Sequence, residues 1–83
     1  MKFDVIWLPD AESELANIWL AATDRNKVTQ AASMIDRALE SNAEDEGESR
    51  PNGQRIAFFE PLAVRYRIVP GTSRVEVLRV WRY

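Results

Sequence analysis

The stretch from Pro61 to Tyr83 constrains the fold more than any other part of the chain. Apolar and cationic residues alternate along it, first up to Val69 and then again from Arg74. This two-residue period is typical of β-strands, whose successive side chains point to opposite faces. The Pro-Gly-Thr-Ser segment between the two runs consists of turn-forming residues. The sequence therefore predicts a β-hairpin.

The first strand of this hairpin has two chemically different faces. Val64, Tyr66 and Ile68 share one face and form an apolar row. Arg65 and Arg67 share the other face. We expect the apolar row to enter the core. We expect the arginine face to be the working surface, since arginine suits planar recognition of phosphate or carboxylate groups.

The two hairpin strands can pair in either of two registers. One register sets Arg67 opposite Glu76, a favourable pair of opposite charges, but places Arg79 on the apolar face. A shift by one residue instead places Leu78 and Val80 on the apolar face. The shifted register gathers five residues on the other face: Arg65, Arg67, Arg79, Trp81 and Tyr83. We favour it because it buries more hydrophobic surface, although it sets like charges opposite each other.

A strand and two helices are predicted at the start of the chain. Residues 3–8 alternate in the manner of a short strand that ends before Pro9. Asp10 and Asp24 are suitable N-caps for two helices with apolar residues at helical spacing, the second running to about Ser41. The link between the helices is so short that they must form a helical hairpin.

The remaining segment separates the helices from the strands. Residues 42–54 contain glycine and proline but no periodic apolar residue, which predicts a surface loop. Residues 55–59 read as a further strand. The expected fold class is α+β, with an N-terminal strand, a helical hairpin and then a three-stranded antiparallel meander. All of it is expected to form a single domain over residues 1–83.

Several conspicuous side chains have a simple structural interpretation. Asp36 and Glu40 lie one helical turn apart, and we interpret them as a solvated face rather than a carboxylate pair for a metal ion or proton transfer. Glu12 and Glu14 are interpreted as solvent-facing residues near the start of the first helix. Three large residues are assigned to the core or its edge: Trp7, Trp19 and Met34.

Composition limits the available chemistry. The chain has no histidine and no cysteine, so any catalysis must rest on Arg, Lys, Tyr and carboxylates. We expect no metal and no small-molecule cofactor. There is no long apolar run and no signal-peptide pattern, which predicts a soluble, cytoplasmic protein that does not enter a membrane.

Charge is distributed unevenly along the chain. The net charge of −2 argues against binding to nucleic acid through overall charge. Acidic residues dominate up to Glu48, whereas the cationic residues that follow are all arginines and outnumber the carboxylates. The chain is therefore acidic in its first part and basic in its last part.

Three segments in order resemble a known toxin family. These are WLPDAESELANIWL near the start, DRNKVTQAASMIDRALESNAEDEGESRPNGQR in the middle and PLAVRYRIVPGTSRVEVLRVW at the end. Together they span nearly the whole chain and resemble the RelE/ParE toxin superfamily of type II toxin–antitoxin systems, often labelled plasmid stabilisation proteins. The resemblance implies a small growth-inhibiting toxin that is neutralised by a cognate antitoxin protein.

The resemblance leaves two classes of target. ParE-like members poison DNA gyrase, whereas RelE-like members cleave mRNA in the ribosome, using cationic residues that stabilise the phosphate. Aligned on Tyr66, the RelE-like pattern has arginines where this chain has Ala63 and Tyr83. We therefore expect gyrase inhibition. The alternatives are a ribosome-dependent mRNA endoribonuclease and a non-toxic binding module of the same fold.

The candidate site residues follow from the hairpin. For a nuclease, the catalytic candidates are Arg65, Arg67 and Arg79. The expected target- or nucleic-acid-binding residues are Arg55, Arg65, Arg67, Arg79, Trp81, Arg82 and Tyr83. Trp81 and Tyr83 could stack on a base beside the arginines. Alternatively, they cover the sheet edge or contact the antitoxin.

Overall fold

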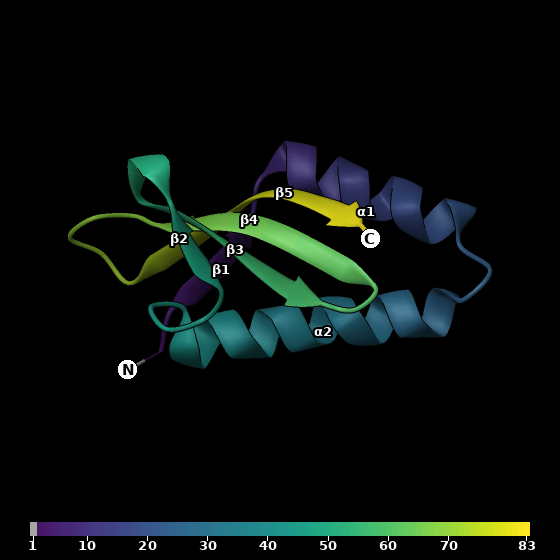
Figure 1. Cartoon of the computed structure of the whole chain (residues 1–83), viewed down its shortest axis with the longest axis horizontal. Helices are drawn as coiled ribbons and strands as arrows, with labels where there is room; N and C mark the ends of the chain where they lie inside the picture. Colours follow the sequence, from purple (N-terminus) through teal and green to yellow (C-terminus); the bar gives the residue numbers. More distant parts are fainter. Residues whose placement is uncertain (1) are drawn as a thin grey trace.

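The structure, a computed structural model, describes residues 2–83 and contains one sheet and two helices (Figure 1). The elements, in chain order, are β1 (Asp4–Trp7), α1 (Pro9–Ala21), α2 (Arg25–Asn42), β2 (Glu48–Arg50), a 3₁₀ turn (Pro51–Gly53), β3 (Gln54–Phe59), β4 (Leu62–Ile68) and β5 (Arg74–Arg82). The predicted α+β class and the order of strand, helical hairpin and antiparallel meander are confirmed. Strand β2 is an addition, because it lies within the segment predicted to be a loop.

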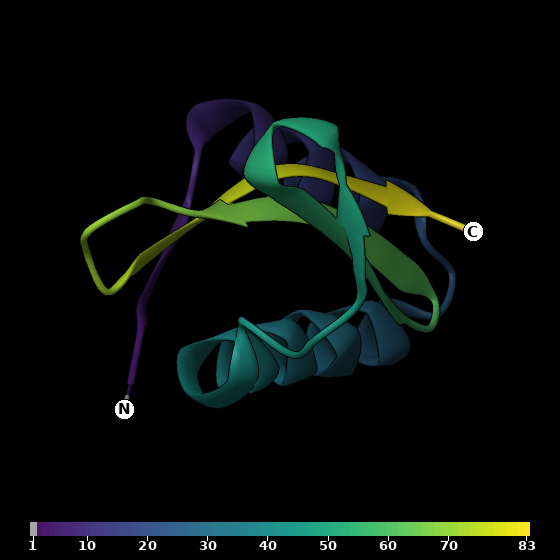
Figure 2. The same cartoon turned by 60° about the vertical axis from the view of Figure 1, so that its left-hand side comes forward.

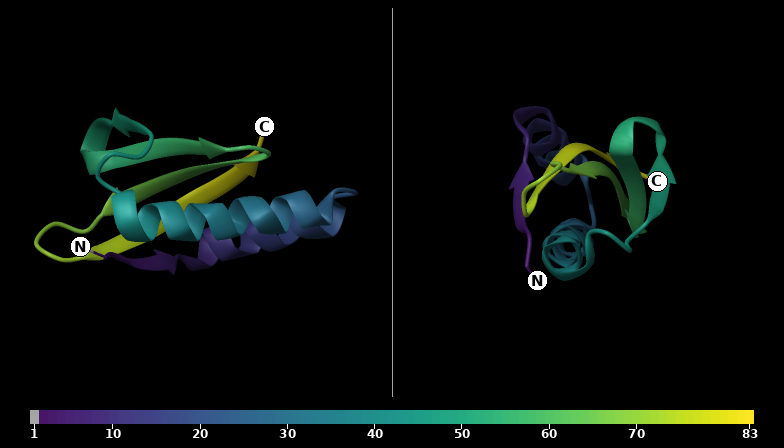
Figure 3. Two further views of the ribbon diagram at one scale, coloured as in Figure 1. Left: turned by 90° about the horizontal axis from the view of Figure 1, so that it is seen from below. Right: turned by 90° about the vertical axis from the view of Figure 1, so that its left-hand side faces the viewer.

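The strands form a five-stranded sheet in the order β1-β5-β4-β3-β2. β1 pairs with β5 in parallel, and the other pairs are antiparallel. The sheet is curved, and α2 runs along its concave side (Figure 2). α1 packs mainly against β5, and the end-on view in Figure 3 shows α1 and α2 at different positions around the curved sheet. The N-terminal strand β1 therefore lies at one edge of the sheet, and the C-terminal strand β5 lies next to it.

The core lies between α2 and the concave face of the sheet. The strands supply alternating residues and α2 supplies residues at helical spacing, as expected for elements that each bury one face. The main buried members are Val28, Ala31, Ile35, Leu39, Ala57, Leu62, Val64, Tyr66, Val75, Val77 and Val80. The apolar row predicted for β4 therefore enters the core.

The β4–β5 hairpin combines the two registers that the pattern allowed. Next to the turn, Arg67 pairs with Glu76, which is the register we did not favour. Farther along, Arg65 pairs with Arg79 and the shifted register holds. A β-bulge at Leu78 takes up the extra residue, so Val77 and Val80 both face the core. The prediction of one shifted register throughout was therefore wrong near the turn.

Two details of the helices differ from expectation. α1 begins at Pro9 with Leu8 as its N-cap, so Asp10 lies in the first turn and is not the cap. Proline suits this first position because its missing N–H has no helical partner there. α2 does follow Asp24 as N-cap, but the Asp24 side chain makes no capping bond. That carboxylate binds Arg82 instead.

Three side chains predicted as core or solvent residues are placed differently. Met34 is exposed, and Trp19 is also partly exposed, so neither fills the core. Asp36 is not merely solvated, since it accepts a 2.7 Å hydrogen bond from Trp7 Nε1.

Among residues 2–83, no helix is both long enough and apolar enough to cross a membrane.

The segment between α2 and β3 is held by Tyr66 and Arg55. The buried Tyr66 hydroxyl lies 2.8 Å from the carbonyl oxygens of both Ala43 and Glu46. Arg55 donates to the Glu46 and Gly47 carbonyls. Burial raises the pKa of Tyr66, so its hydroxyl stays protonated and remains a donor. These bonds satisfy backbone groups that neither helix nor sheet pairs.

Candidate target-binding face

The sheet has a face that points away from α2, which we call the open face. Its central residues form rows across β3, β4 and β5, because paired residues of neighbouring strands point to the same side. The first row is Phe58, Ala63 and Trp81; the second is Ile56, Arg65 and Arg79; the third is Gln54, Arg67 and Glu76. The open face thus changes from aromatic at one end to ionic at the other.

The bulge determines which residues share this face. Without the extra residue at Leu78, Arg79 would point into the core and Val80 would point outward. With it, Arg65 and Arg79 lie directly opposite each other. The structure therefore brings together Arg65, Arg67, Arg79 and Trp81 as the shifted register predicted.

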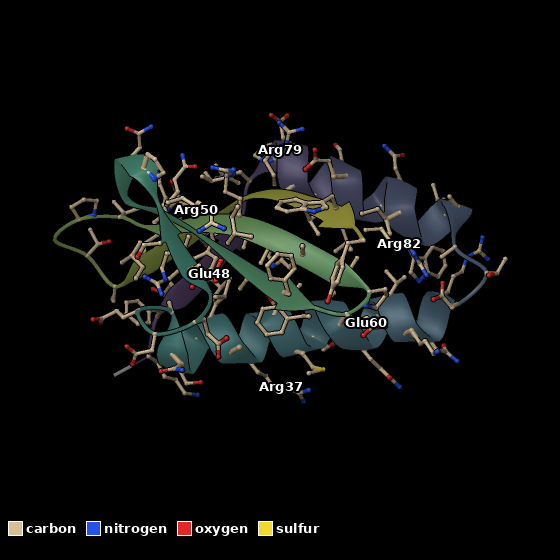
Figure 4. All side chains as sticks on the ribbon, viewed as in Figure 1. Arg37, Glu48, Arg50, Glu60, Arg79 and Arg82 are labelled. Atoms are coloured by element: carbon tan, nitrogen blue, oxygen red, sulfur yellow. The ribbon has the colours of Figure 1, made fainter. Side chains whose placement is uncertain are left out.

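Arg79 is tied to the helical layer by Glu14 of α1. Glu14 Oε2 accepts a 2.7 Å hydrogen bond from Arg79 Nε, and Glu14 Oε1 accepts one from the Val80 backbone N–H at 3.0 Å. The pairing of β1 with β5 ends at Trp7 and Val77, so this carboxylate satisfies an N–H of β5 beyond the end of that ladder. Figure 4 shows Arg79 beside the start of α1.

The pKa shifts of this pair follow from the same contact. Hydrogen bonding to Arg79 lowers the pKa of Glu14, with the Val80 N–H adding to the effect against partial burial. The same contact raises the pKa of Arg79. Both groups are therefore held in their charged forms, and Glu14 is not a solvated residue as the sequence suggested.

The other two arginines of the open face have different partners. Arg67 Nε donates to Glu76 Oε1 at 2.9 Å, an ion pair that Arg74 also joins from the same strand as Glu76. Arg65 donates to the neutral amide oxygen of Gln54 at 2.8 Å. Among these three arginines, Arg65 is thus the one without a carboxylate partner within the described residues 2–83.

Arg55 and Arg82 do not join the open face. Arg55 pairs with core-facing Tyr66 and is used to hold the loop before β3. Arg82 reaches the opposite side and binds both carboxylate oxygens of Asp24, at 2.8 and 2.6 Å (Figure 4). Both arginines thus have partners within the chain, and their role in target binding stays a prediction.

An aromatic corner ends the open face at the β3–β4 turn. We define it as Phe58, Trp81 and Tyr83. Phe58 and Tyr83 are 55% and 57% exposed, and their rings meet edge to face with centroids 5.3 Å apart. Ala63 lies between Phe58 and Trp81 in the first row and is fully buried. Sequence reasoning found Trp81 and Tyr83 but missed Phe58.

A second surface feature lies on the helical side. An apolar groove with a volume of about 830 Å³ runs between β1, α1 and α2. Its residues include Val5, Ile6, Leu15, Trp19, Leu20 and Ala32. Arg25 lies over the Trp19 ring at 4.7 Å and Trp19 Nε1 donates to Thr29, which fixes the indole at the groove wall. The sequence analysis assigned Trp19 to the core or its edge, because helical spacing does not reveal which apolar residues remain uncovered.

The open face combines ion-paired arginines with aromatic side chains. Two of the three arginines proposed as catalytic are bound to carboxylates, which reduces their capacity to stabilise a developing phosphate charge. Ala63, where the RelE-like pattern has an arginine, is buried and lies opposite Phe58 and Trp81. Within residues 2–83, no three carboxylates are placed to hold a metal ion. What remains is a rigid surface with aromatic rings and guanidinium groups.

Comparison with known proteins connects this geometry to a family. The sequence matches the family described as the ParE toxin of the type II toxin–antitoxin system ParDE over residues 5–82. A search of curated proteins finds no match. Solved structures are also similar in fold, and two of them come from toxin–antitoxin systems.

The first of these structures is a chain of the chromosomal ParDE system from P. aeruginosa. It has a TM-score of 0.74 and 22% identity, and the similarity covers 98% of this chain and 96% of the other. The second is a chain of the RelBE2 toxin–antitoxin complex from Mycobacterium tuberculosis. It has a TM-score of 0.81 and 17% identity, and each chain is covered completely.

Proposed function

The chain belongs to the ParE toxin family of type II toxin–antitoxin systems, and from this premise we propose that it inhibits DNA gyrase by binding through its open face. As a member of that family it is the toxin component of such a system. The observation that carries the proposal is that two arginines of the open face are ion-paired within the chain. Arg67 and Arg79 are held by Glu76 and Glu14, so the face offers shape and charge for contact but little free cationic capacity for phosphate chemistry.

The apolar groove is proposed to receive a segment of the cognate antitoxin. Leu20 is 62% exposed, and Ile6 and Trp19 also present apolar surface there. Exposed apolar surface of this kind is typical of protein interaction sites. An amphipathic antitoxin segment would cover it, and the toxin would then be held in a complex.

The groove and the open face lie on different elements. β1, α1 and α2 line the groove, while β3, β4 and β5 form the centre of the open face. The two surfaces share no residue among those named for either one. Antitoxin contacts and target contacts can therefore be separated by substitution.

A supercoiling assay tests the proposed function. The purified chain should inhibit DNA supercoiling by gyrase, and addition of the cognate antitoxin should restore it. In parallel, the chain is added to a translating extract and mRNA is examined for cleavage. Cleavage without any effect on gyrase would replace the proposal with ribosome-dependent endoribonuclease activity. Absence of both effects, together with harmless expression, would leave a non-toxic binding module.

A further inference from the structure

The aromatic corner presents apolar surface that no described part of the chain covers. Phe58 and Tyr83 remain more than half exposed although Ala63 beneath the corner is already fully buried. The burial of Ala63 therefore leaves the outer surfaces of the Phe58 and Tyr83 rings exposed to solvent. Phe59, by contrast, packs against the core from the other side of β3. The placement of Phe58 leaves a large ring in water, which is the kind of feature that marks a binding site.

The backbone of the corner is held in place by strand pairing. Phe58 of β3 and Trp81 of β5 lie on the two strands that flank β4, each opposite Ala63. The Tyr83 N–H donates to the Pro61 carbonyl at 3.1 Å, so strand pairing continues past Arg82. Strand pairing therefore fixes the backbone that carries these rings, and aromatic residues dominate the strongest contacts in protein interfaces.

The charges beside the corner select the chemistry of the partner. The row next to the aromatic row contains Arg65 and Arg79. Glu14 neutralises Arg79, but Arg65 faces the neutral Gln54 side chain. A carboxylate on a partner would therefore meet an unpaired positive charge at the edge of an apolar patch.

We infer that the aromatic corner is the anchor by which this toxin holds its protein target, with Arg65 meeting a carboxylate of the target at its edge. The inference rests on the proposed function and names the part of the open face that carries the binding. The partner surface it fits is an apolar side chain flanked by acidic residues.

A protein target fits the corner better than a nucleic acid does. The Phe58 and Tyr83 rings are inclined at 75°, so they do not offer two parallel surfaces for successive bases. Two of the three open-face arginines are already paired with carboxylates, and the chain as a whole has a net charge of −2. Phosphate groups would therefore gain little from this face.

The test compares Phe58→Ala and Tyr83→Ala with Leu20→Ala, a truncation of an exposed apolar residue in the groove. Gyrase inhibition, antitoxin affinity and melting temperature are measured for each protein. We expect the two corner variants to need about tenfold more protein for half-inhibition, with antitoxin affinity unchanged. Leu20→Ala should instead lower antitoxin affinity and leave gyrase inhibition unchanged. Both corner side chains are exposed, so the fold should survive, and Arg65→Gln provides a further variant that leaves the rings in place.

The outcomes separate this inference from the proposed function. If the wild-type chain does not inhibit gyrase, the proposed function fails and takes the inference with it. If the wild type inhibits gyrase and the folded corner variants inhibit it equally well, only the inference is overturned. Loss of antitoxin affinity in the corner variants, or binding of single-stranded RNA that depends on the corner, would also overturn it.

Discussion

Arg65 of β4 lies directly opposite Arg79 of β5, so two guanidinium groups share one cross-strand row on the open face. Like charges in this position are unfavourable unless each has another partner. Arg79 is drawn to Glu14 on α1, and Arg65 to Gln54 on β3. The row is therefore stabilised from both sides, and its two arginines have unequal capacity to bind a further carboxylate.

Removal of the Glu14 side chain should loosen the exposed part of β5. Glu14→Ala takes away the acceptor of Arg79 and of the Val80 N–H. We expect the free energy of unfolding to fall by about 1–2 kcal/mol, as for the loss of hydrogen bonds to a charged, partly exposed group. Chemical denaturation measures this value. Glu12→Ala on the same helix is the control and should stay within about 0.5 kcal/mol of wild type; equal losses in the two variants would contradict the assigned role.

Stability should decline in acid because of two depressed carboxyl pKa values. Hydrogen bonds from Arg79 and Arg82 lower the pKa of Glu14 and of Asp24 below their ordinary values of 4.5 and 3.8. The folded state then binds protons less readily than the unfolded state, so the contribution is complete above about pH 4.5 and is lost as the pH falls through the lowered values. Glu14→Gln and Asp24→Asn should flatten the pH dependence of the melting temperature. If the melting temperature of both variants falls in acid as it does for the wild type, these two contacts are not the cause of the acid destabilisation.

Two glycines in left-handed conformations provide a matched test of close packing. Gly47 has φ +65°, and a Cβ there would lie 2.1 Å from the Ile56 carbonyl oxygen of β3. Gly71 has φ +75° but open space around it. We expect Gly71→Ala to cost about 1–2 kcal/mol for the conformation alone, and Gly47→Ala to cost roughly 3 kcal/mol or more because the backbone must also move. Thermal unfolding compares the two, and similar melting temperatures would be inconsistent with the close approach at Gly47.

A charge placed in the apolar groove should separate antitoxin binding from toxicity. Leu20 is exposed, so Leu20→Arg leaves the core unchanged while it puts a guanidinium where an apolar contact is proposed. We expect antitoxin affinity to fall at least about tenfold, with gyrase inhibition retained. Calorimetry with the cognate antitoxin measures the change. Lys27→Arg on α2, outside the groove, is the control; wild-type affinity in Leu20→Arg would place the antitoxin elsewhere.

Much of the architecture could be predicted because it depends on local pattern. Alternation along residues 64–69 indicated which side chains of β4 enter the core, and helical spacing from Val28 to Leu39 identified the buried stripe of α2. These signals come from neighbours in sequence. Even Trp81 on β5 and Tyr83 just after it followed from alternation once Arg79 was placed on the open face.

Other features required the tertiary structure. Two registers were each consistent with the pattern, and only the bulge at Leu78 showed that both are used. The partner of Arg79 is Glu14, 65 residues away in sequence, and no spacing rule links them. Phe58 was missed because strand alternation does not distinguish it from Phe59 until the β3–β4 pairing is known.

The sequence by itself determined the order of the helices and of every strand except β2, the core-facing residues of β4 and the concentration of arginine in the second half of the chain. The tertiary structure decided which arginines are free to bind. Ion pairs such as Arg82 with Asp24 form between elements that meet only after the helices have packed on the sheet. Charge composition therefore predicts that a cationic face exists, whereas its remaining capacity depends on which carboxylates the fold brings beside it.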